Sequence, residues 1–332
     1  MEERSIHLEL WRQMVRIRRV EESIAQRYPR GEMRCPTHLC VGQEAVPAAA
    51  GLALKKTDLM VGTHRSHGHY LAKGGDLTAM LAEILGKATG CARGRGGSMH
   101  LVDLEAGFEG STAIVGGSIP VGVGLALPMK LRQTGQVSVV FLGDGATEEG
   151  TFYESLNFAA LKALPVVFLC ENNLYSVHTP LEKRRPGNFN LTAMVRALGM
   201  DARSLDGNDA WAAYGAITVA VDQARRGRGP VFLQCDTYRW LEHCGPFPDS
   251  DLGYRSSAEV DAWRAKDPCK NMAAYLLERG WADKASLAGL EAEMDREIEA
   301  AWEQALAAPT PEEEMGRSGR FAPERRKPWH AD

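Results

Sequence analysis

Val137-Ser-Val-Val-Phe-Leu-Gly-Asp-Gly145 and Pro165-Val-Val-Phe-Leu-Cys-Glu-Asn-Asn173 are two apolar runs that each end in polar residues. Their length and composition are typical of buried parallel strands. Residues 146–171, 26 in number, leave room for a helix between the two strand ends. Because ligands in open α/β sheets bind at the carboxyl ends of strands, this unit predicts Asp144 and Asn173 side by side at one edge of a sheet.

The residue types at this edge suit a metal ion and a phosphate group. Mg²⁺ takes hard oxygen ligands, usually one or two from the protein and the rest from phosphate and water, and Asp144 and Asn173 offer such oxygens. Gly143 and Gly145 permit a tight turn and a close approach of backbone to phosphate. Residues 147–163 read as a helix, whose N-terminus would direct N–H groups at an anion. The pattern predicts Mg²⁺ bound together with a diphosphate.

Further motifs along the chain indicate a family. The spacing from Gly-Asp-Gly to Asn-Asn resembles the thiamine-diphosphate fingerprint, and the whole series, over roughly residues 8–305, resembles the α subunit of the two-chain 2-oxo acid dehydrogenase E1 enzymes of the pyruvate, branched-chain and acetoin types. A lone Gly-Asp-Gly is weak evidence, whereas six ordered motifs are specific. They are His38-Leu-Cys-Val-Gly-Gln-Glu-Ala45, His64-Arg-Ser-His-Gly68, Gly94-Arg-Gly-Gly-Ser-Met-His100, Ile114-Val-Gly116, Cys170-Glu-Asn-Asn-Leu-Tyr175 and Thr237-Tyr-Arg239.

The expected fold is α/β, with a mostly parallel sheet and helices on both faces, because strands and helices alternate along the chain. The resemblance implies the thiamine-diphosphate-binding fold of the diphosphate-binding type, with N- and C-terminal helical extensions. We expect one domain over residues 1–308 and a flexible or partner-contacting tail over 309–332. Helices are expected at 7–28, 44–54, 77–85, 118–132, 147–163 and 208–226 and, after a capping box of Ser256 and Glu259, up to about 308; strands are expected at 59–62, 137–142, 165–170 and 230–236; residues 90–113 read as irregular.

The resemblance also implies a ligand set. Mg²⁺ is expected on Asp144, the side chain of Asn173 and the backbone carbonyl of Tyr175. The diphosphate of thiamine diphosphate is expected on Arg65, whose fork suits phosphate oxygens. Two histidines match catalytic positions of the family, and the remaining residues would surround the cofactor. The catalytic pair is His38 and His243, and the other cofactor contacts are His64, Ala113, Val115 at the aminopyrimidine, the backbone of Gly145 and Ala146, Val177 as an apolar buttress, and His243 near the diphosphate.

One part of the family's active site is missing from this chain. In the family, the glutamate that protonates the aminopyrimidine ring belongs to the β chain, and no second pyrimidine-binding module is seen here. The resemblance therefore implies a β subunit, an α₂β₂ assembly, and a lipoyl acyltransferase as a candidate partner, with a small 2-oxo acid as substrate. Two alternatives stay open: a decarboxylase or carboligase of a specialised pathway without a lipoyl partner, and a catalytically silent subunit that binds cofactor for assembly.

The sequence departs from the family pattern at the mouth of the expected site. His64 stands where an aromatic residue is usual, and Ala113 replaces a common glycine. The loop after Tyr-Arg reads Trp240-Leu-Glu-His-Cys-Gly-Pro-Phe-Pro-Asp-Ser-Asp251 instead of a segment close to His-Gly-His-Ser-Met-Ser-Asp. Cys244 replaces a serine that is phosphorylated in the animal enzymes, so that route of control is not expected. The altered loop suggests a changed substrate or acyl acceptor.

Simpler interpretations of the same residues compete with these. Gly-Asp-Gly taken alone could be an ordinary turn. The cluster of His64, His67 and His69 suggests zinc, but no cysteine or carboxylate nearby in the sequence offers a fourth ligand. The pair in Gly122-Val-Gly124 resembles part of a dinucleotide fingerprint, but Leu127 stands at the third glycine position and no strand precedes it. Glycines that allow close helix packing are the favoured interpretation there.

Composition agrees with a cytoplasmic enzyme. The 332-residue chain has 44% hydrophobic and 25% charged residues and a net charge of −4, which gives no electrostatic case for nucleic acid or membrane binding. No apolar run has the 18 or so residues that a membrane span needs. The first residues are unlike a signal peptide and too acidic for a transit peptide. Seven cysteines without a Cys-x-x-Cys suit a reducing compartment, with Cys170 and Cys235 as core thiols.

Overall fold

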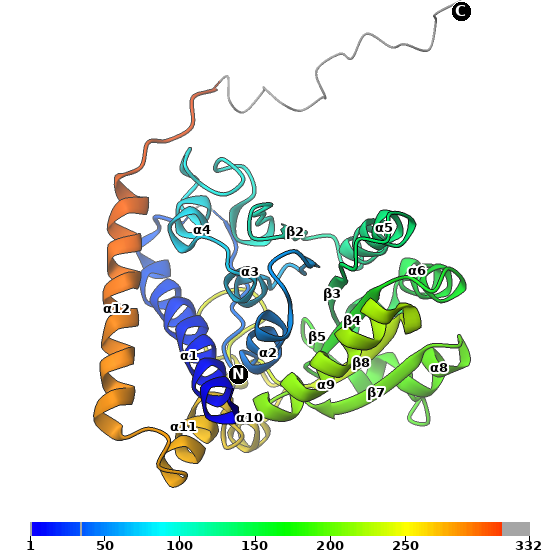
Figure 1. Cartoon of the computed structure of the whole chain (residues 1–332). Helices are drawn as coiled ribbons and strands as arrows, with labels where there is room; N and C mark the ends of the chain where they lie inside the picture. Colours follow the sequence, from blue (N-terminus) through cyan, green and yellow to red (C-terminus); the bar gives the residue numbers. More distant parts are fainter. Residues whose placement is uncertain (1, 34, 314–332) are drawn as a thin grey trace, which may run out of the picture.

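The chain is built on a six-stranded sheet in which every neighbouring pair of strands is parallel (Figure 1). The structure is a computed structural model that describes residues 2–33 and 35–313. The predicted parallel α/β architecture is confirmed. The strands, in their order across the sheet, are β2 (Phe108–Gly110), β1 (Leu59–Val61), β3 (Ser138–Gly143), β4 (Val166–Asn172), β8 (Val231–Asp236) and β7 (Asp201–Asp206).

Helices cover both faces of this sheet, as predicted. Successive side chains of a strand point to opposite faces, so Val139 and Phe141 enter one hydrophobic core, whereas Val140 and Leu142 enter the other. The first core packs against α1 (Glu3–Arg27), α2 (Ala45–Ala53), α3 (His67–Lys73), α4 (Leu77–Ile84), α9 (Ala210–Gln223), α11 (Pro268–Glu278) and α12 (Lys284–Ala307), and the second against α5 (Ser118–Leu131), α6 (Gly150–Leu161) and α8 (Leu191–Ala197).

The first and last long helices form the expected helical extensions. α1 and α12 run side by side at the edge of the molecule farthest from the sheet (Figure 1). Leu10, Met14 and Ile17 of α1 are buried and face the core. On the side of α1 that faces α12, the Trp302 ring N–H donates to the Ser23 hydroxyl at 3.0 Å. The ion pairs across the two helices are partly exposed and contribute little to stability. They are Arg16–Glu297, Arg19–Glu291 and Arg27–Glu299.

Some elements differ from the sequence-based expectation. Strand β7 was not predicted, because an edge strand reading Asp-Ala-Arg-Ser-Leu-Asp lacks a continuous apolar run. Strand β2 lies inside residues 90–113, which were expected to be irregular. The helix expected from residue 147 begins instead at Gly150, because a 3₁₀ turn over Asp144–Glu148 comes first and Glu149 is extended. The N-terminus of α6 is therefore displaced from the Gly-Asp-Gly turn.

The caps at helix ends were predicted in part. Asp76 caps α4 by accepting a hydrogen bond from the Ala79 N–H at 2.6 Å. Ser256 likewise accepts from the Glu259 N–H at the start of α10 (Ser257–Arg264). The reciprocal half of the expected capping box is not formed, because the Glu259 carboxylate accepts hydrogen bonds from Tyr175 and Tyr238.

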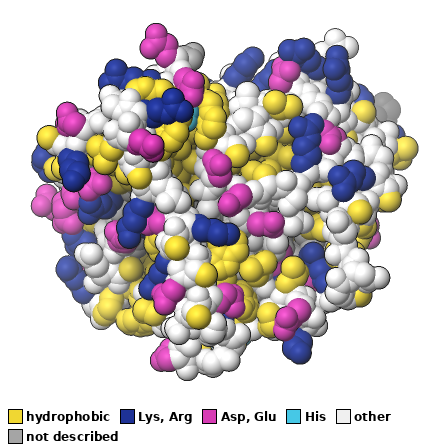
Figure 2. Space-filling view, turned by 90° about the horizontal axis from the view of Figure 1, so that it is seen from below, with side chains coloured by type: hydrophobic (Ala, Val, Ile, Leu, Met, Phe, Trp, Pro, Cys, Tyr) yellow, Lys and Arg dark blue, Asp and Glu magenta, His cyan; other side chains and the backbone are white. Residues whose placement is uncertain are grey.

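Several global expectations can also be compared with the structure. All seven cysteines are free thiols, and Cys170 and Cys235 lie in the core. Among the described residues, no helix combines the length and the apolar character needed to cross a bilayer. Figure 2 shows acidic and basic side chains interspersed over one face of the molecule. The predicted tail over residues 309–332 falls largely outside the described residues.

Candidate active site

One cavity at the carboxyl ends of β3 and β4 is lined by every residue that the sequence placed in the site. It holds about 940 Å³ of space, part of which opens to solvent. Segments far apart in the chain meet here, because parallel strands deliver their following loops to the same edge of the sheet. The predicted residues around it are His38, His64, Arg65, Ala113, Val115, Asp144, Gly145, Ala146, Asn173, Tyr175, Val177 and His243.

The predicted magnesium ligands lie at the floor of this cavity. Asp144 directly follows β3, and its side chain is only 2% exposed. The Asn173 side chain is held from two sides: its oxygen accepts from the Tyr175 N–H at 3.3 Å, and its nitrogen donates to the Gln43 side-chain oxygen at 3.1 Å. Parallel pairing of β3 with β4 brings these residues to adjacent strand ends. A carboxylate and an amide oxygen held in this way fit a hard cation.

A cation already rests on this carboxylate. Arg184, at the end of the short helix α7 (Leu181–Arg184), donates hydrogen bonds to the carboxylates of Asp144 and Glu148. Arg185 donates to the backbone carbonyl of Asp144 at 3.0 Å. The Arg184 guanidinium neutralises the Asp144 carboxylate in this structure. These arginines were not predicted as site residues. The run of basic residues at 183–185 indicates positive charge, but nothing in the sequence indicates that Arg184 pairs with Asp144.

Arg65 is a buried cation without a carboxylate partner. Its side chain donates to the Leu39 carbonyl at 2.6 Å and to the His243 carbonyl at 3.1 Å, and the residue is 5% exposed. Across the described part of the chain, no carboxylate forms an ion pair with it. Burial, together with the positive charge of Arg239, lowers the pKa of Arg65 to about 10. Because carbonyl groups do not neutralise a buried charge, Arg65 is suited to meet an anion in the cavity.

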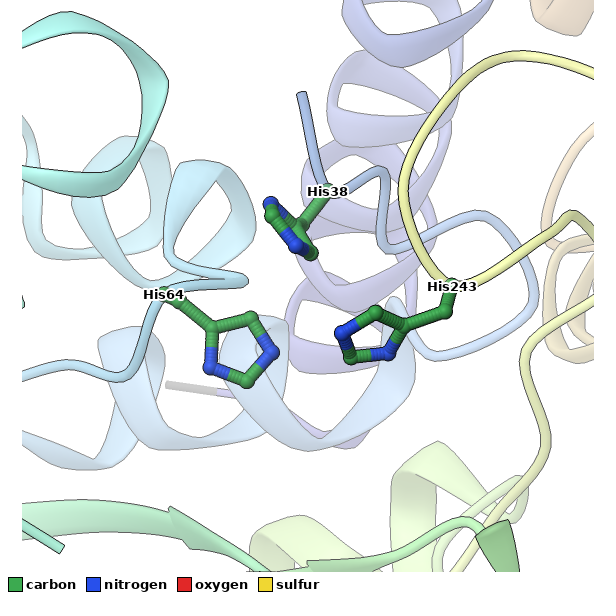
Figure 3. A group of neighbouring side chains, drawn as sticks. All are labelled: His38, His64 and His243. Carbon is green, nitrogen blue, oxygen red and sulfur yellow. The ribbon is translucent and has the colours of Figure 1, made fainter. Parts of the chain in front are cut away.

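His38, His64 and His243 form a cluster on the same side of the cavity (Figure 3). Their ring centroids are 4.8 Å apart for His38 and His64, 4.9 Å for His38 and His243, and 5.4 Å for His64 and His243. Burial is the largest cause that lowers the pKa of each ring to about 3, and the positive charge of Arg65 is the next. All three imidazoles are therefore neutral near pH 7 and can accept a proton or a hydrogen bond.

The zinc grouping considered for His64, His67 and His69 is not formed. His67 and His69 lie in the first turn of α3, and residues two apart on a helix point to different sides. The ring of His67 hydrogen-bonds Glu21 at 3.0 Å and Ser98 at 2.8 Å, and that of His69 hydrogen-bonds Glu171 at 2.9 Å. Those two histidines stabilise the interior, whereas His64 faces the cavity.

A short hairpin presents Val177 to the cavity. β5 (Tyr175–Ser176) pairs with β6 (Thr179–Pro180), and Val177 begins the turn with φ of 55°. This left-handed conformation is strained for a β-branched residue and persists only where the surroundings hold it. Arg239 donates to the Val177 carbonyl at 2.7 Å and secures it. The side chain remains 46% exposed and lines the cavity.

The glycine-rich segment before Met99 is organised by a residue that the sequence did not indicate. Glu83 is completely buried in α4. Charge-assisted hydrogen bonds to a carboxylate are stronger than those between neutral groups. Its two carboxylate oxygens accept four backbone N–H groups, from Ala92 at 2.8 Å, Gly94 at 2.8 Å, Gly96 at 2.6 Å and Gly97 at 3.1 Å.

The altered loop over residues 240–251 is held by a buried ionic network. Asp249 forms ion pairs with Arg239, at 3.3 Å, and with Arg255. Tyr254 donates to the same carboxylate. The Gly245 N–H donates to the Thr37 carbonyl at 2.9 Å, which joins this loop to the segment that carries His38. The departure from the family sequence therefore leaves His243 in the cavity, with a defined set of supports.

The dinucleotide interpretation of Gly122 is excluded by packing. A Cβ atom on Gly122 would lie 2.3 Å from Val140 and 2.9 Å from Val61, so this glycine lets α5 approach the sheet. The helix-packing interpretation is confirmed for Gly122. Gly124 does not share that role. Apart from its chain neighbours and the backbone of its own helix, no atom of the described residues lies within 4 Å of the position that a Cβ would take there.

Comparison with known proteins agrees with this geometry. The sequence model of the family described as "Dehydrogenase E1 component" matches residues 12–314. The α subunit of acetoin:2,6-dichlorophenolindophenol oxidoreductase from Bacillus subtilis (strain 168) is 39% identical over 305 residues, which cover 92% of this chain and 90% of that protein. The pyruvate dehydrogenase E1 component subunit alpha of Rickettsia bellii (strain RML369-C) is 36% identical over 308 residues, which cover 93% of each chain. The chain belongs to the dehydrogenase E1 component family.

Proposed function

We propose that this chain is the α subunit of a heteromeric E1 enzyme that decarboxylates a small 2-oxo acid and passes the acyl group to an acceptor, with thiamine diphosphate and Mg²⁺ as cofactors. The observation that carries the proposal is the uncompensated buried charge of Arg65, which shares one cavity with the oxygen ligands Asp144 and Asn173. This combination suits a diphosphate bound together with a divalent cation. The cofactor would supply the electron sink for cleavage of the bond to CO₂.

The protein groups divide the work of binding. Asp144, the Asn173 side chain and the Tyr175 carbonyl would hold Mg²⁺, once Arg184 has left the Asp144 carboxylate. Arg65 would pair with the diphosphate through its guanidinium. The 3₁₀ turn after β3 would direct backbone N–H groups of Gly145 and Ala146 at the same anion. The Asp144 carboxylate would thus have a positive partner both without the cofactor, from Arg184, and with it, from the metal ion.

Apolar and imidazole groups would orient the reacting end of the cofactor. Val177 is held by its strained turn, which makes it a rigid support for a bent cofactor. Ala113 and Val115 line the wall of the cavity where the aminopyrimidine ring is expected. His38 and His243 are neutral and face the cavity, so either can accept or hold a proton on the substrate during the reaction. His64 would contact the diphosphate side of the cluster.

The proposal includes a β subunit, because the glutamate that activates the aminopyrimidine is expected from that chain. Ile114 and Val115 support this assignment, since they are 72% and 47% exposed at the rim of the cavity, where a partner would cover them. An α₂β₂ assembly and a lipoyl acyltransferase as acyl acceptor belong to the proposal. A cytoplasmic location stays a prediction; one relative, from Arabidopsis thaliana, carries the name chloroplastic.

The proposal is tested by calorimetry on the chain co-expressed with its β subunit. Thiamine diphosphate is titrated in the presence of Mg²⁺ into the wild type, Asp144→Ala and a matched control, Asp222→Ala, whose carboxylate is exposed on α9 away from the cavity. The same samples are assayed for CO₂ release from a panel of 2-oxo acids. We expect binding and turnover in the wild type and the control, and neither in Asp144→Ala.

Each departure from that result has a distinct meaning. Binding that is lost equally in Asp222→Ala would indicate general damage instead of a metal site. Binding without CO₂ release from any acid would contradict the decarboxylase assignment and favour a silent subunit. No binding in the wild-type complex would overturn the proposal as a whole.

A further inference from the structure

The three-histidine cluster of His38, His64 and His243 has the composition of a transition-metal site. We propose that it binds one divalent transition-metal ion such as Zn²⁺, at a place separate from the expected magnesium site. One ring nitrogen from each residue can be chosen so that all three lie within 4.8 Å of one another. The residues come from three segments, before α2, after β1 and in the 240–251 loop, and their rings converge (Figure 3).

The ring nitrogens are available for coordination. His38 is buried, with 7% exposure, and its Nδ1 atom has no hydrogen-bond partner among the described residues. Within residues 2–33 and 35–313, no hydrogen bond reaches a ring nitrogen of His64 or His243 either. The rings of His67 and His69 each have one nitrogen on a carboxylate, although Nδ1 of His69 is also without a partner among the described residues. Buried polar atoms are nearly always paired, so an unpaired nitrogen on a buried imidazole that lies beside two other imidazoles points to a ligand.

The chemistry of three neutral imidazoles selects the class of metal. Zn²⁺, Co²⁺ and Ni²⁺ bind imidazole nitrogen, and three histidines with an open fourth position are a known coordination for Zn²⁺. Mg²⁺ prefers oxygen and would bind at Asp144 and Asn173 instead. The lowered pKa of each ring supports the proposal, because a metal ion does not have to displace protons near pH 7.

The geometry requires a small contraction. With metal–nitrogen bonds of about 2.0–2.1 Å, tetrahedral ligand nitrogens lie about 3.4 Å apart. The three rings must therefore approach one another by an ångström or so, through rotation of side chains at the cavity surface. The cations Arg65 and Arg239 face the cluster and will weaken binding, whereas Glu171 in the same cavity opposes them. We expect affinity well below that of a structural zinc site.

A metal ion at this place would obstruct the cavity. Part of the inference rests on the proposed function: if the cavity holds thiamine diphosphate, Zn²⁺ on the cluster would inhibit the enzyme reversibly, because His38 and His243 would no longer be free to accept a proton. The binding itself does not depend on that function. His64, a residue by which this chain departs from its family pattern, supplies the third ligand.

The test uses Co²⁺ as a spectroscopic probe on the full-length chain with its β subunit, without a histidine tag and with thiamine diphosphate removed. Excess Mg²⁺ is present throughout to fill the oxygen site. We expect saturable binding of one Co²⁺ per α chain, with the visible absorption of a tetrahedral nitrogen site, and displacement by Zn²⁺. His64→Phe and His243→Ala should each weaken binding at least about tenfold. The matched control His100→Ala, whose side chain is exposed outside the cavity, should bind as the wild type does.

Other outcomes would overturn the inference. Absence of a saturable Co²⁺ signal up to millimolar metal would do so, as would binding that survives in both His64→Phe and His243→Ala. A signal lost in Asp144→Ala but retained in His64→Phe would assign the metal to the oxygen ligands. Circular dichroism of His64→Phe, in which a slightly larger flat ring replaces the imidazole, tests whether the variant is folded. Co²⁺ binding in a complex that releases no CO₂ would leave this site standing while the proposed function fails.

Discussion

Arg184 and Asp144 form an ion pair inside the cavity, so the carboxylate expected to bind Mg²⁺ is already neutralised in this structure. Both side chains are buried, at 7% and 2% exposure. At the proposed metal site, Arg184 would have to leave the Asp144 carboxylate before Mg²⁺ could bind. Arg184 would therefore compete with the metal ion for Asp144.

Replacing Arg184 by Gln should strengthen Mg²⁺ binding to the complex. We expect the apparent dissociation constant to fall about tenfold, equivalent to about 1.4 kcal/mol, because the competing cation is removed. Calorimetric titration of Mg²⁺ at fixed thiamine diphosphate measures the change. Arg185→Gln is the matched control, since it removes the same charge nearby without touching the carboxylate. An equal increase in Mg²⁺ affinity in both variants would indicate that any nearby positive charge weakens binding, and would contradict direct competition by Arg184.

Arg65→Gln should separate cofactor affinity from stability. Removing a buried charge that has only carbonyl partners should raise the free energy of unfolding of the cofactor-free complex by about 1 kcal/mol. The same change should weaken thiamine diphosphate binding about a hundredfold, because charge-assisted hydrogen bonds to the diphosphate are lost. Thermal denaturation and calorimetry measure the two effects. Arg65→Lys keeps the charge but not the planar guanidinium, so its affinity for thiamine diphosphate should lie between those of the wild type and Arg65→Gln. An Arg65→Gln variant that is destabilised but binds the cofactor normally would assign Arg65 a structural role.

Stability should decline in mild acid because of the histidine cluster. Each of His38, His64 and His243 has a folded-state pKa of about 3, below the ordinary value of 6.5. Their contribution is complete above pH 6.5 and is lost as the pH falls from 6.5 towards 3, because only the unfolded chain takes up protons there. His64→Phe should reduce the slope of unfolding free energy against pH by at most about 1.4 kcal/mol per pH unit.

Urea unfolding of the wild type and His64→Phe at pH 7.5, 6.5 and 5.5 tests this dependence. The exposed His100→Phe serves as the control and should keep the wild-type slope. Parallel curves for wild type and His64→Phe would mean that His64 titrates normally in the folded protein.

Glu83→Gln should loosen the glycine-rich segment. The neutral amide loses charge-assisted hydrogen bonds to the four N–H groups, and its nitrogen cannot accept any, so we expect a loss of about 2–3 kcal/mol of stability. Limited trypsin digestion should show faster cleavage at Arg93 and Arg95, which lie within the segment. The matched control is Glu105→Gln, an exposed residue. Unchanged cleavage in Glu83→Gln would show that the segment is held by other contacts.

The central strands and the fingerprint could be read from the sequence because their signals are local. β3 and β4 are continuous apolar runs, and the residues that follow them reach the site by the topology of a parallel sheet alone. Edge strand β7 escaped prediction since its exposed face is polar. The helix after Gly-Asp-Gly was also predicted from a local pattern, but its first residue was predicted wrongly. The 3₁₀ turn that precedes it is too short to leave a periodic pattern in the sequence.

Contacts between distant segments were beyond the reach of sequence patterns. His64, His67 and His69 are neighbours in the chain, yet His64 joins His38 and His243 in space. Arg184, in α7 directly after the β5–β6 hairpin, reaches Asp144, which lies 40 residues away in the sequence. The residues that the resemblance implied all line one cavity. Buried supports such as Glu83, which holds the glycine-rich segment, depend on tertiary packing that no spacing rule contains.

The one-sided placement of the site has a practical consequence for protein engineering. The loops after β1, β3 and β4 line the cavity, together with the segment before α2. The turn that precedes β3, at residues 133–135, lies at the opposite end of that strand and is exposed. Insertion of a reporter domain or an immobilisation tag at that turn should leave ligand affinity unaltered. The length of the strands would separate the inserted module from the cavity.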